Sequence, residues 1–206
     1  MTSGAGTEHP APLPAPLVVV SGPSGVGKTT VVEQLIREST VPLRRAVTAT
    51  TRQPRPGEID GTSYHFWTHN HFRSAVDDGR MLEWELVFDS DYYGTPRSEV
   101  DPYRAAGLGV VLVIDVKGAS RVRTVCPDCL SVFIAPPSFE VLEARLRRRN
   151  DLEEGKLLRR LQTARLELAR AGEFDHIIVN DEVPRAVREL DGLIREHCRR
   201  RGKTDA

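Results

Sequence analysis

Four short apolar runs recur along the chain, and each is followed by a segment with the residue spacing of a helix. The first run, LVVV, is rich in β-branched residues, as expected of a strand that is buried on both faces of a parallel sheet. The four runs lie at residues 17–20, 110–114, 130–135 and 176–179. Their alternation with helical segments predicts the α/β class, with an open, mainly parallel sheet and flanking helices.

Apolar residues spaced three or four positions apart predict the helices. The predicted helices cover residues 30–39 and 138–149, a segment with the apolar stripe Leu157, Leu161, Ala164 and Leu168, and a last segment lined by Val187, Leu190 and Ile194. Residues 48–95 break this pattern, because they are rich in glycine, proline, arginine and aromatic residues and show no long helix. We interpret them as an insertion that binds a substrate.

The chain has 206 residues, the length of one domain with insertions. Residues 1–16 offer little apolar surface and predict a disordered tail, and residues 201–206 are assigned to a C-terminal tail. Basic and acidic residues both number 29, so neither a nucleic acid nor a membrane surface is expected as a partner. Without a signal peptide or a run of about 20 apolar residues, we expect a cytoplasmic location. The sequence does not indicate the oligomeric state.

The three cysteines are too few for a disulfide framework, which fits a reducing compartment. The segment CPDC, at residues 126–129, has the spacing of a zinc half-site or a redox pair. No second pair of ligands follows it, so we expect neither.

The first apolar run leads directly into GPSGVGKT, which satisfies the phosphate-loop (P-loop) pattern G-x-x-x-x-G-K-[ST] between a strand and a helix. Such a loop cradles phosphates with its backbone N–H groups and with the partial positive charge of the helix N-terminus. We expect Lys28 to reach the β- and γ-phosphates and Thr29 to bind Mg²⁺. The predicted nucleotide-binding residues of this loop are Gly22, Pro23, Ser24, Gly25, Val26, Gly27, Lys28, Thr29 and Thr30.

Two arginines, Arg52 and Arg55, flank a proline-stiffened bend, and Tyr64 follows nine residues later. Guanidinium groups bind phosphate bidentately and a tyrosine hydroxyl can add one bond, so this set suits a monophosphate. A solvated basic loop paired with Glu58 and Asp60 explains the same residues, and both interpretations stay open.

Glu83 stands beside Trp84 in MLEWELVF, a strand that should be partly buried. A buried carboxylate needs hydrogen-bond donors, and guanine supplies two adjacent ones, N1–H and the exocyclic amino group. Adenine offers an acceptor and one donor at the same edge. Glu83 therefore fits a guanine reader, although a glutamate on a strand more often faces solvent.

These motifs occur together and in order, and through them the chain resembles the guanylate kinases from Leu17 to Leu190. The resemblance rests on GPSGVGKT, TTRQPRPGE with Gly61 and Tyr64, LEW, YYGTP, IAPPS and VND. It implies ATP-dependent phosphorylation of GMP by one domain over residues 17–200. The implied parts are a P-loop core (17–47, 96–138 and 173–200), a GMP-binding insertion (48–95) and a helical lid (139–172).

The resemblance also implies roles for individual residues. The implied GMP ligands are Thr48, Arg52, Arg55, Tyr64, Glu83, Tyr93, Thr95 and Asp115, with Lys28, Arg52, Arg149 and Arg160 as catalytic residues and Arg145 and Asn180 as ATP contacts. Val113 stands where the family often has the first aspartate of a D-x-D pair.

Two other functions remain possible on this scaffold. A kinase of a phosphorylated ribose would share the P-loop and the lid but would not need Glu83. A non-catalytic module that binds phosphorylated peptides would keep the fold but typically lose the P-loop.

Overall fold

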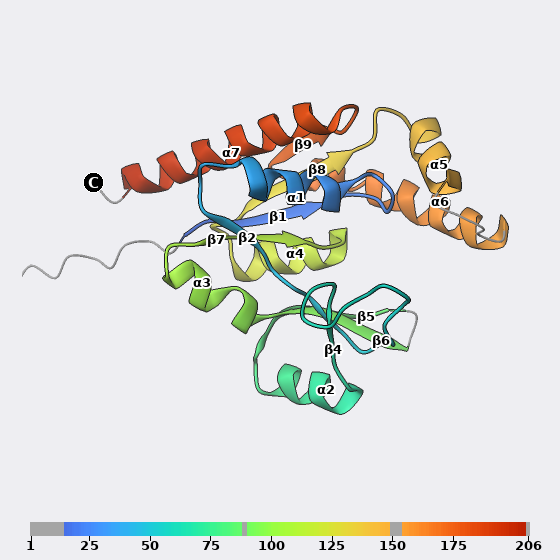
Figure 1. Cartoon of the computed structure of the whole chain (residues 1–206), viewed down its shortest axis with the longest axis horizontal. Coiled ribbons are helices and arrows are strands. Elements are labelled where there is room, and N and C mark those ends of the chain that lie inside the picture. Colours follow the sequence, from blue (N-terminus) through green and yellow to red (C-terminus); the bar gives the residue numbers. More distant parts are fainter. Residues whose placement is uncertain (1–14, 88–89, 149–153, 205–206) are drawn as a thin grey trace, which may run out of the picture.

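The computed structural model describes residues 15–87, 90–148 and 154–204, with side chains up to Arg201. Its centre is a five-stranded sheet in the order β2-β7-β1-β8-β9, in which all neighbouring strands are parallel (Figure 1). The strands are β1 (Leu17–Ser21), β2 (Leu43–Arg45), β7 (Gly109–Val113), β8 (Leu130–Ala135) and β9 (His176–Val179). The predicted α/β class with a mainly parallel sheet is confirmed.

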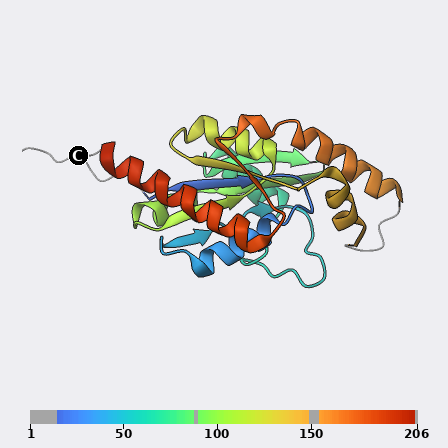
Figure 2. The same ribbon diagram turned by 90° about the horizontal axis from the view of Figure 1, so that it is seen from above.

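Strand β1 is buried on both faces of this sheet. Alternate side chains of a strand point to opposite faces, so Val18 and Val20 enter one apolar core while Leu17 and Val19 enter the other. Figure 2 shows the strands between α1 and α7 on one side and α4 on the other. The helices around the sheet are α1 (Lys28–Glu38), α3 (Asp101–Ala105), α4 (Val116–Val125), α5 (Phe139–Arg148), α6 (Glu154–Leu168) and α7 (Val183–Thr204), with short 3₁₀ helices η1 (Arg97–Glu99) and η2 (Ala171–Glu173).

A second, smaller sheet is formed by the segment that breaks the helical pattern (Figure 1). Its strands, in spatial order, are β4 (His65–Phe66), β3 (Ala49–Thr50), β6 (Asp91–Pro96) and β5 (Met81–Val87). Helix α2 (His69–Asp77) covers it, and Phe72 and Ala75 of this helix share a separate core with Ala49 and Met81. The sheet therefore has its own small apolar core.

The chain crosses between the two sheets near one carboxylate, that of Glu99. Its Oε2 accepts a hydrogen bond from the backbone N–H of Val47 (3.1 Å) and one from Arg44 Nη2 (2.8 Å). Its Oε1 lies 3.0 Å from His65 Nε2 in the smaller sheet. We call this set the Glu99 junction, and it ties the entry and the exit of the insertion to the core.

Both ends of the folded part differ from the predicted boundaries. Pro16 accepts from the backbone N–H of Val110, and Ala15 accepts from Arg104 Nε (2.7 Å), so these two residues extend the edge of the fold. Residues 1–14 of the predicted tail lie outside the described residues. At the other end α7 continues to Thr204, because Arg201 Nη1 donates to the Asp128 carboxylate (2.6 Å) and holds the helix against the core.

Strand β2 and helix α2 are among the elements that do not follow from the apolar pattern. Strand β2 has a single apolar residue, Leu43, and exists because its backbone pairs with β7. Helix α2 has nine residues and buries only two of them. Among the described helices, none combines the length and the apolarity that crossing a membrane requires.

Candidate functional site

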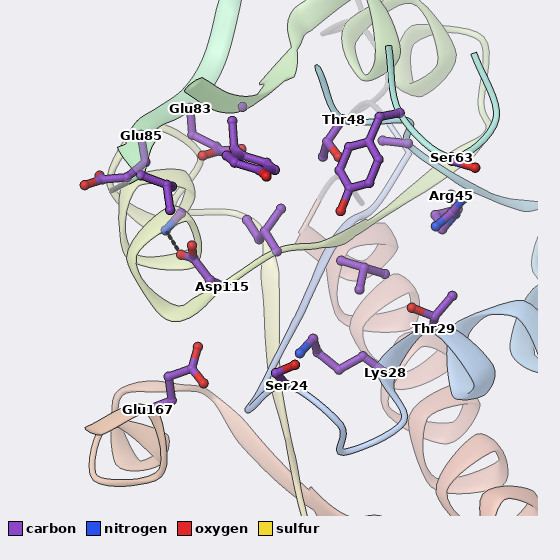
Figure 3. Close-up of a pocket in the computed structure, with 18 of the residues that line it drawn as sticks. Ser24, Lys28, Thr29, Arg45, Thr48, Ser63, Glu83, Glu85, Asp115 and Glu167 are labelled. Atoms are coloured by element: carbon purple, nitrogen blue, oxygen red, sulfur yellow. Dashed lines mark hydrogen bonds between the residues drawn. The ribbon is translucent and has the colours of Figure 1, made fainter. Parts of the chain in front are cut away.

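A cavity of about 470 Å³ opens between the carboxyl ends of the parallel strands and the smaller sheet (Figure 3). Ligands of parallel α/β proteins bind at these strand ends. Predicted site residues line the cavity from both sides: Ser24, Gly25, Gly27, Lys28, Thr29 and Thr30 from the core, Thr48, Tyr64, Glu83 and Tyr93 from the insertion, and Asp115 after β7. The cavity thus joins the predicted phosphate loop to five of the predicted acceptor residues, whereas Arg52, Arg55 and Thr95 are not among its lining residues.

The P-loop follows β1 and ends where α1 begins, at Lys28 rather than at the predicted residue 30. Gly27 has φ 99°, and a Cβ there would lie 2.7 Å from Asn180 Nδ2. Gly22 is more restricted, because its Cβ would lie 2.2 Å from the Ile134 carbonyl oxygen. Only glycine allows this backbone to curl so tightly against β8 and Asn180. The turn starts the helix at the loop, and Lys28, Thr29 and Thr30 of its first turn line the cavity.

Lys28 lies along this loop. Its Nζ donates to the carbonyl oxygens of Gly22 (2.6 Å) and Pro23 (3.1 Å). Figure 3 places Lys28 beside Ser24 and near Thr29 at one end of the cavity. These contacts hold the ammonium group where the loop would receive phosphate oxygens.

Two predicted ATP contacts, Arg145 and Asn180, meet behind the loop at the Val26 carbonyl oxygen. Asn180 Nδ2 donates to it (2.7 Å), and Arg145 Nη1 donates to it (3.3 Å) while Nη2 donates to the Asn180 carbonyl oxygen (3.0 Å). Neither residue is among those that line the cavity. Arg160 lies exposed on α6, also away from the cavity lining, and Arg149 is outside the described residues. In this arrangement Arg145 and Asn180 support the loop from outside.

Glu83 is buried, with 6% of its surface exposed. The pairing of β5 with β6 places it opposite Thr95, whose hydroxyl donates to Glu83 Oε1 (2.7 Å). Helix α4 closes over the other oxygen, since a Cβ on Gly118 would lie 3.0 Å from Oε2. Burial raises the pKa of Glu83 to about 7, and the bond from Thr95 opposes part of this rise. A solvent-facing glutamate is therefore excluded, and the carboxylate lines the cavity while it accepts a hydrogen bond from Thr95.

Arg52 is already engaged by the protein. Its Nη1 and Nη2 bind the two oxygens of Glu58 (2.6 and 2.7 Å), its Nε donates to the Tyr93 hydroxyl (3.0 Å), and Nη1 also donates to the Gln53 carbonyl (2.9 Å). The guanidinium of Arg52 lowers the pKa of Glu58 to about 2. The ion pair expected of a basic loop is thus present. Arg55 has an exposed side chain, and its backbone N–H donates to Glu58 (2.7 Å).

The two neighbouring tyrosines of β6 have different positions. Tyr93 lines the cavity, and its ring centroid lies 6.2 Å from that of Tyr64 in an edge-to-face arrangement. Tyr92 instead stacks on Phe72 in the core of the smaller sheet, with centroids 5.1 Å apart. The strand alternation thus places Tyr93, and not Tyr92, beside Tyr64 at the cavity.

Asp115 caps a helix at the edge of the cavity. Its Oδ1 accepts from the backbone N–H groups of Lys117 and Gly118, each at 2.8 Å, at the start of α4 (Figure 3). The capping role uses one oxygen, and the other remains available to a ligand. Val113, the residue at the first position of the D-x-D pattern, lines the cavity with an apolar side chain.

Four polar residues that line the cavity were not predicted from the sequence: Arg45, Ser63, Glu85 and Glu167. Glu167 lies on α6, and burial raises the pKa of its carboxyl. Glu85 lies two residues after Glu83 on the same face of β5 and pairs with Lys117 at 3.5 Å. The period of two along β5 was a usable signal for Glu85, whereas no local pattern indicates the other three.

The cavity can accept a magnesium ion that is bound mainly by phosphates. The hydroxyl of Thr29 lines it next to Lys28. Within the described ranges, no group of three or more histidine, cysteine or acidic side chains forms a metal cage. Magnesium usually takes few protein ligands and is completed by substrate phosphates and water, so a single hydroxyl fits. The CPDC cysteines are free, and burial raises the pKa of the Cys129 thiol to about 12, which disfavours the thiolate that metal or redox chemistry needs.

A phosphate loop at the carboxyl edge of a parallel sheet, facing an insertion with a buried carboxylate, defines a P-loop nucleotide-binding protein with a second substrate site. The family model for guanylate kinase matches residues 15–197. The chain belongs to the guanylate kinase family.

Individual relatives agree with this assignment. The chain is 47% identical over 178 residues to a guanylate kinase of Nocardia farcinica, a match that covers 86% of this chain and 92% of the relative. It is 45% identical over 178 residues to a guanylate kinase of Synechococcus sp. (strain JA-3-3Ab), covering 86% of this chain and 81% of the relative. A crystal structure of guanylate kinase from Anaplasma phagocytophilum superposes with a TM-score of 0.71 at 27% identity, covering 90% of this chain and 86% of the other.

Proposed function

We propose that this chain transfers the γ-phosphoryl group of ATP to GMP and produces ADP and GDP. One observation carries the proposal: the P-loop Lys28 and the buried carboxylate of Glu83 line the same cavity. The family assignment supports it, as do the guanylate kinase relatives. The division into a core, a GMP-binding insertion and a lid formed by α5 and α6 is part of the proposal.

The proposed reaction requires positioning and charge neutralisation. The phosphate oxygen of GMP that attacks is already anionic, so no side chain has to act as a base. Lys28 and the amides at the start of α1 bind the phosphates of ATP. Mg²⁺, held by Thr29 and the phosphates, would neutralise charge on the transferring group. Roles of Arg145, Arg149 and Arg160 in closing a lid over ATP stay predictions.

Guanine recognition is assigned to Glu83. With Thr95 donating to Oε1, the carboxylate retains acceptor capacity for the N1–H and amino groups of guanine. We assign Thr48 and Asp115 as further contacts of the nucleoside and Arg52, Arg55, Tyr64 and Tyr93 as ligands of its phosphate. A cytoplasmic location and small-molecule partners only, without nucleic acid or membrane, also stay predictions.

The two alternative functions are not favoured. A kinase of a phosphorylated ribose has no use for a buried carboxylate aimed at a base, and the intact P-loop disfavours a non-catalytic peptide-binding module. The relatives reported above are guanylate kinases by name.

The proposal is tested by measuring ADP production with GMP, AMP, CMP and UMP offered separately, and with ribose 1,5-bisphosphate as a fifth acceptor. We expect turnover with GMP to exceed that with the other acceptors by at least two orders of magnitude, by the logic of unpaired buried polar groups. Equal turnover of AMP and GMP would refute Glu83 as the base reader, and turnover of the ribose alone would support the alternative kinase.

Glu58→Gln tests how Arg52 is held. Glu58 accepts hydrogen bonds from two groups of the loop that carries Arg52 and Arg55: the guanidinium of Arg52 and the backbone N–H of Arg55. A neutral amide accepts fewer and weaker bonds from a guanidinium, so we expect the KM for GMP to rise about tenfold with a smaller change in kcat. Steady-state kinetics with varied GMP measures both constants.

The exposed Asp78→Asn, in the same insertion, is the matched control for this variant. A lower KM in Glu58→Gln would contradict the expectation. It would mean that the Glu58 carboxylate competes with the acceptor phosphate for Arg52 instead of positioning it.

A further inference from the structure

The cavity holds more negative than positive side chains, although both substrates bring phosphates. Its described acidic residues are Glu83, Glu85, Asp115 and Glu167, whereas Lys28 and Arg45 are its described basic residues. Lys28 belongs to the P-loop and contacts loop carbonyl oxygens. Among the described residues that line the cavity, Arg45 is the one with a guanidinium group, and it lies on the side of the proposed acceptor site.

The direction of Arg45 follows from its place on β2. The preceding residue, Arg44, points to the opposite face of the strand, where its guanidinium binds Glu99 (2.8 Å) and lies 3.7 Å over the Tyr103 ring. Alternation along the strand therefore turns Arg45 toward the cavity. Figure 3 places Arg45 between Ser63 on the insertion and Thr29 on α1. This position is the junction of the two proposed substrate sites.

Arg45 also retains hydrogen-bond donors. Within the described residues its Nη2 donates to the Thr62 carbonyl oxygen (3.0 Å), which leaves most of the five N–H groups of a guanidinium for a ligand. Arg52, in contrast, uses four of its five N–H groups on Tyr93, Gln53 and Glu58. A phosphate beside Tyr64 and Tyr93 thus finds more available donors on Arg45 than on Arg52.

We propose that Arg45 binds the 5′-phosphate of the acceptor nucleotide from the side of the P-loop, in addition to the predicted phosphate ligands of the insertion. This inference rests on the proposed function. When a dianionic acceptor approaches the γ-phosphoryl group, the two anions repel each other, and a guanidinium between Thr29 and Ser63 offsets that repulsion. Its planar fork can hold two phosphate oxygens and so fix the attacking oxygen.

The test compares GMP with guanosine, which lacks the phosphate, by calorimetric titration of wild type and Arg45→Gln. We expect Arg45→Gln to weaken GMP binding about tenfold and to lower kcat as well, with guanosine binding unchanged. Arg45→Lys keeps the positive charge but loses the planar fork of the guanidinium. Its affinity for GMP should therefore lie between those of wild type and Arg45→Gln. The exposed Arg73→Gln in α2, which removes the same charge outside the cavity, is the control.

Each result supports or overturns the inference. Unchanged GMP binding and turnover in Arg45→Gln overturn it, and so does an equal loss for GMP and guanosine, which indicates that Arg45 only anchors the Thr62 turn. Retained melting temperature in the variant shows that the loss is not misfolding. If the wild-type enzyme does not phosphorylate GMP at all, the proposed function fails instead, which is a distinct outcome.

Discussion

Glu83→Gln is expected to lower kcat/KM for GMP by about 100- to 1000-fold. The carboxylate can accept from both donors of guanine, whereas an amide presents one acceptor and one donor to them. A donor facing a donor in a buried site leaves polar groups unpaired, at a cost of about 3–4 kcal/mol. The site cannot relax by admitting bulk water, because Glu83 is 6% exposed and Thr95 and Gly118 close around its oxygens. The acceptor panel, repeated with the variant, measures this selectivity.

The pH dependence of the KM for GMP, measured for wild type and Glu83→Gln, tests the same role independently. Because burial raises the pKa of Glu83 to about 7, protonation below pH 7 removes the anion that guanine requires, so the KM for GMP rises as pH falls. The contribution of Glu83 to the stability of the folded protein, in contrast, increases as pH falls. The folded pKa lies above the unfolded value of 4.5, so the stability that protonated Glu83 contributes is complete below pH 4.5 and is lost as pH rises through 7.

Glu83→Gln should therefore unfold at a higher temperature than wild type above pH 7, with a difference of up to about 3 kcal/mol in the free energy of unfolding. Thermal melts without ligand from pH 4 to 9 measure it. Asp78→Asn, an exposed carboxylate in the same insertion, should shift neither selectivity nor the pH profile. Full GMP turnover in Glu83→Gln would remove the basis for guanine recognition by this residue.

Lys28→Met should reduce kcat by about 10²–10³ and leave GMP binding nearly unchanged. Methionine keeps the unbranched stem that fills the loop but cannot neutralise charge that develops on the phosphates, and the loss of one such contact costs this much in comparable sites. Lys28 donates hydrogen bonds to the P-loop carbonyl oxygens of Gly22 and Pro23, on the core side of the cavity. The substitution therefore leaves the GMP contacts on the insertion undisturbed.

Single-turnover kinetics measure the chemical step in Lys28→Met, and titration with GMP alone measures acceptor binding. Lys117→Met serves as the control, since Lys117 is exposed and pairs with Glu85 at 3.5 Å outside the P-loop. Unchanged turnover in Lys28→Met would refute the assigned role, and a large loss of GMP affinity would mean that the lysine also reaches the acceptor.

The features that the sequence predicted best are those that depend on the local pattern of residues. Strands buried on both faces are apolar almost throughout, so β1, β7 and β8 could be located from their residues alone. The edge strand β9 has an apolar run too and could be located in the same way, although Ile177 and Val179 are exposed. The P-loop could be found because its glycines are required by backbone geometry that no other residue adopts. Glu83 could be singled out because an acidic residue in an apolar strand context demands a partner, and its burial agrees with that argument.

Features that depend on contacts distant in sequence were missed. Strand β2 depends on pairing with β7, more than 60 residues away, and its residues carry no strand pattern of their own. Arg45 and Glu167 face the cavity only because β2 and α6 converge there. For Arg52, charge and spacing indicated two possible partners, a phosphate and Glu58. Only the structure shows that the ion pair between Arg52 and Glu58 is formed.

The Glu99 junction brings both chain crossings of the insertion to one point. Away from this point, β5 of the insertion also packs on α4, where Gly118 lies against Glu83 and Lys117 pairs with Glu85, so these contacts fix the distance between the nucleobase pocket and the core. A compound that spans the nucleobase pocket and the P-loop would have to match this distance. Its affinity would therefore depend on linker length more steeply than on the contacts at either end.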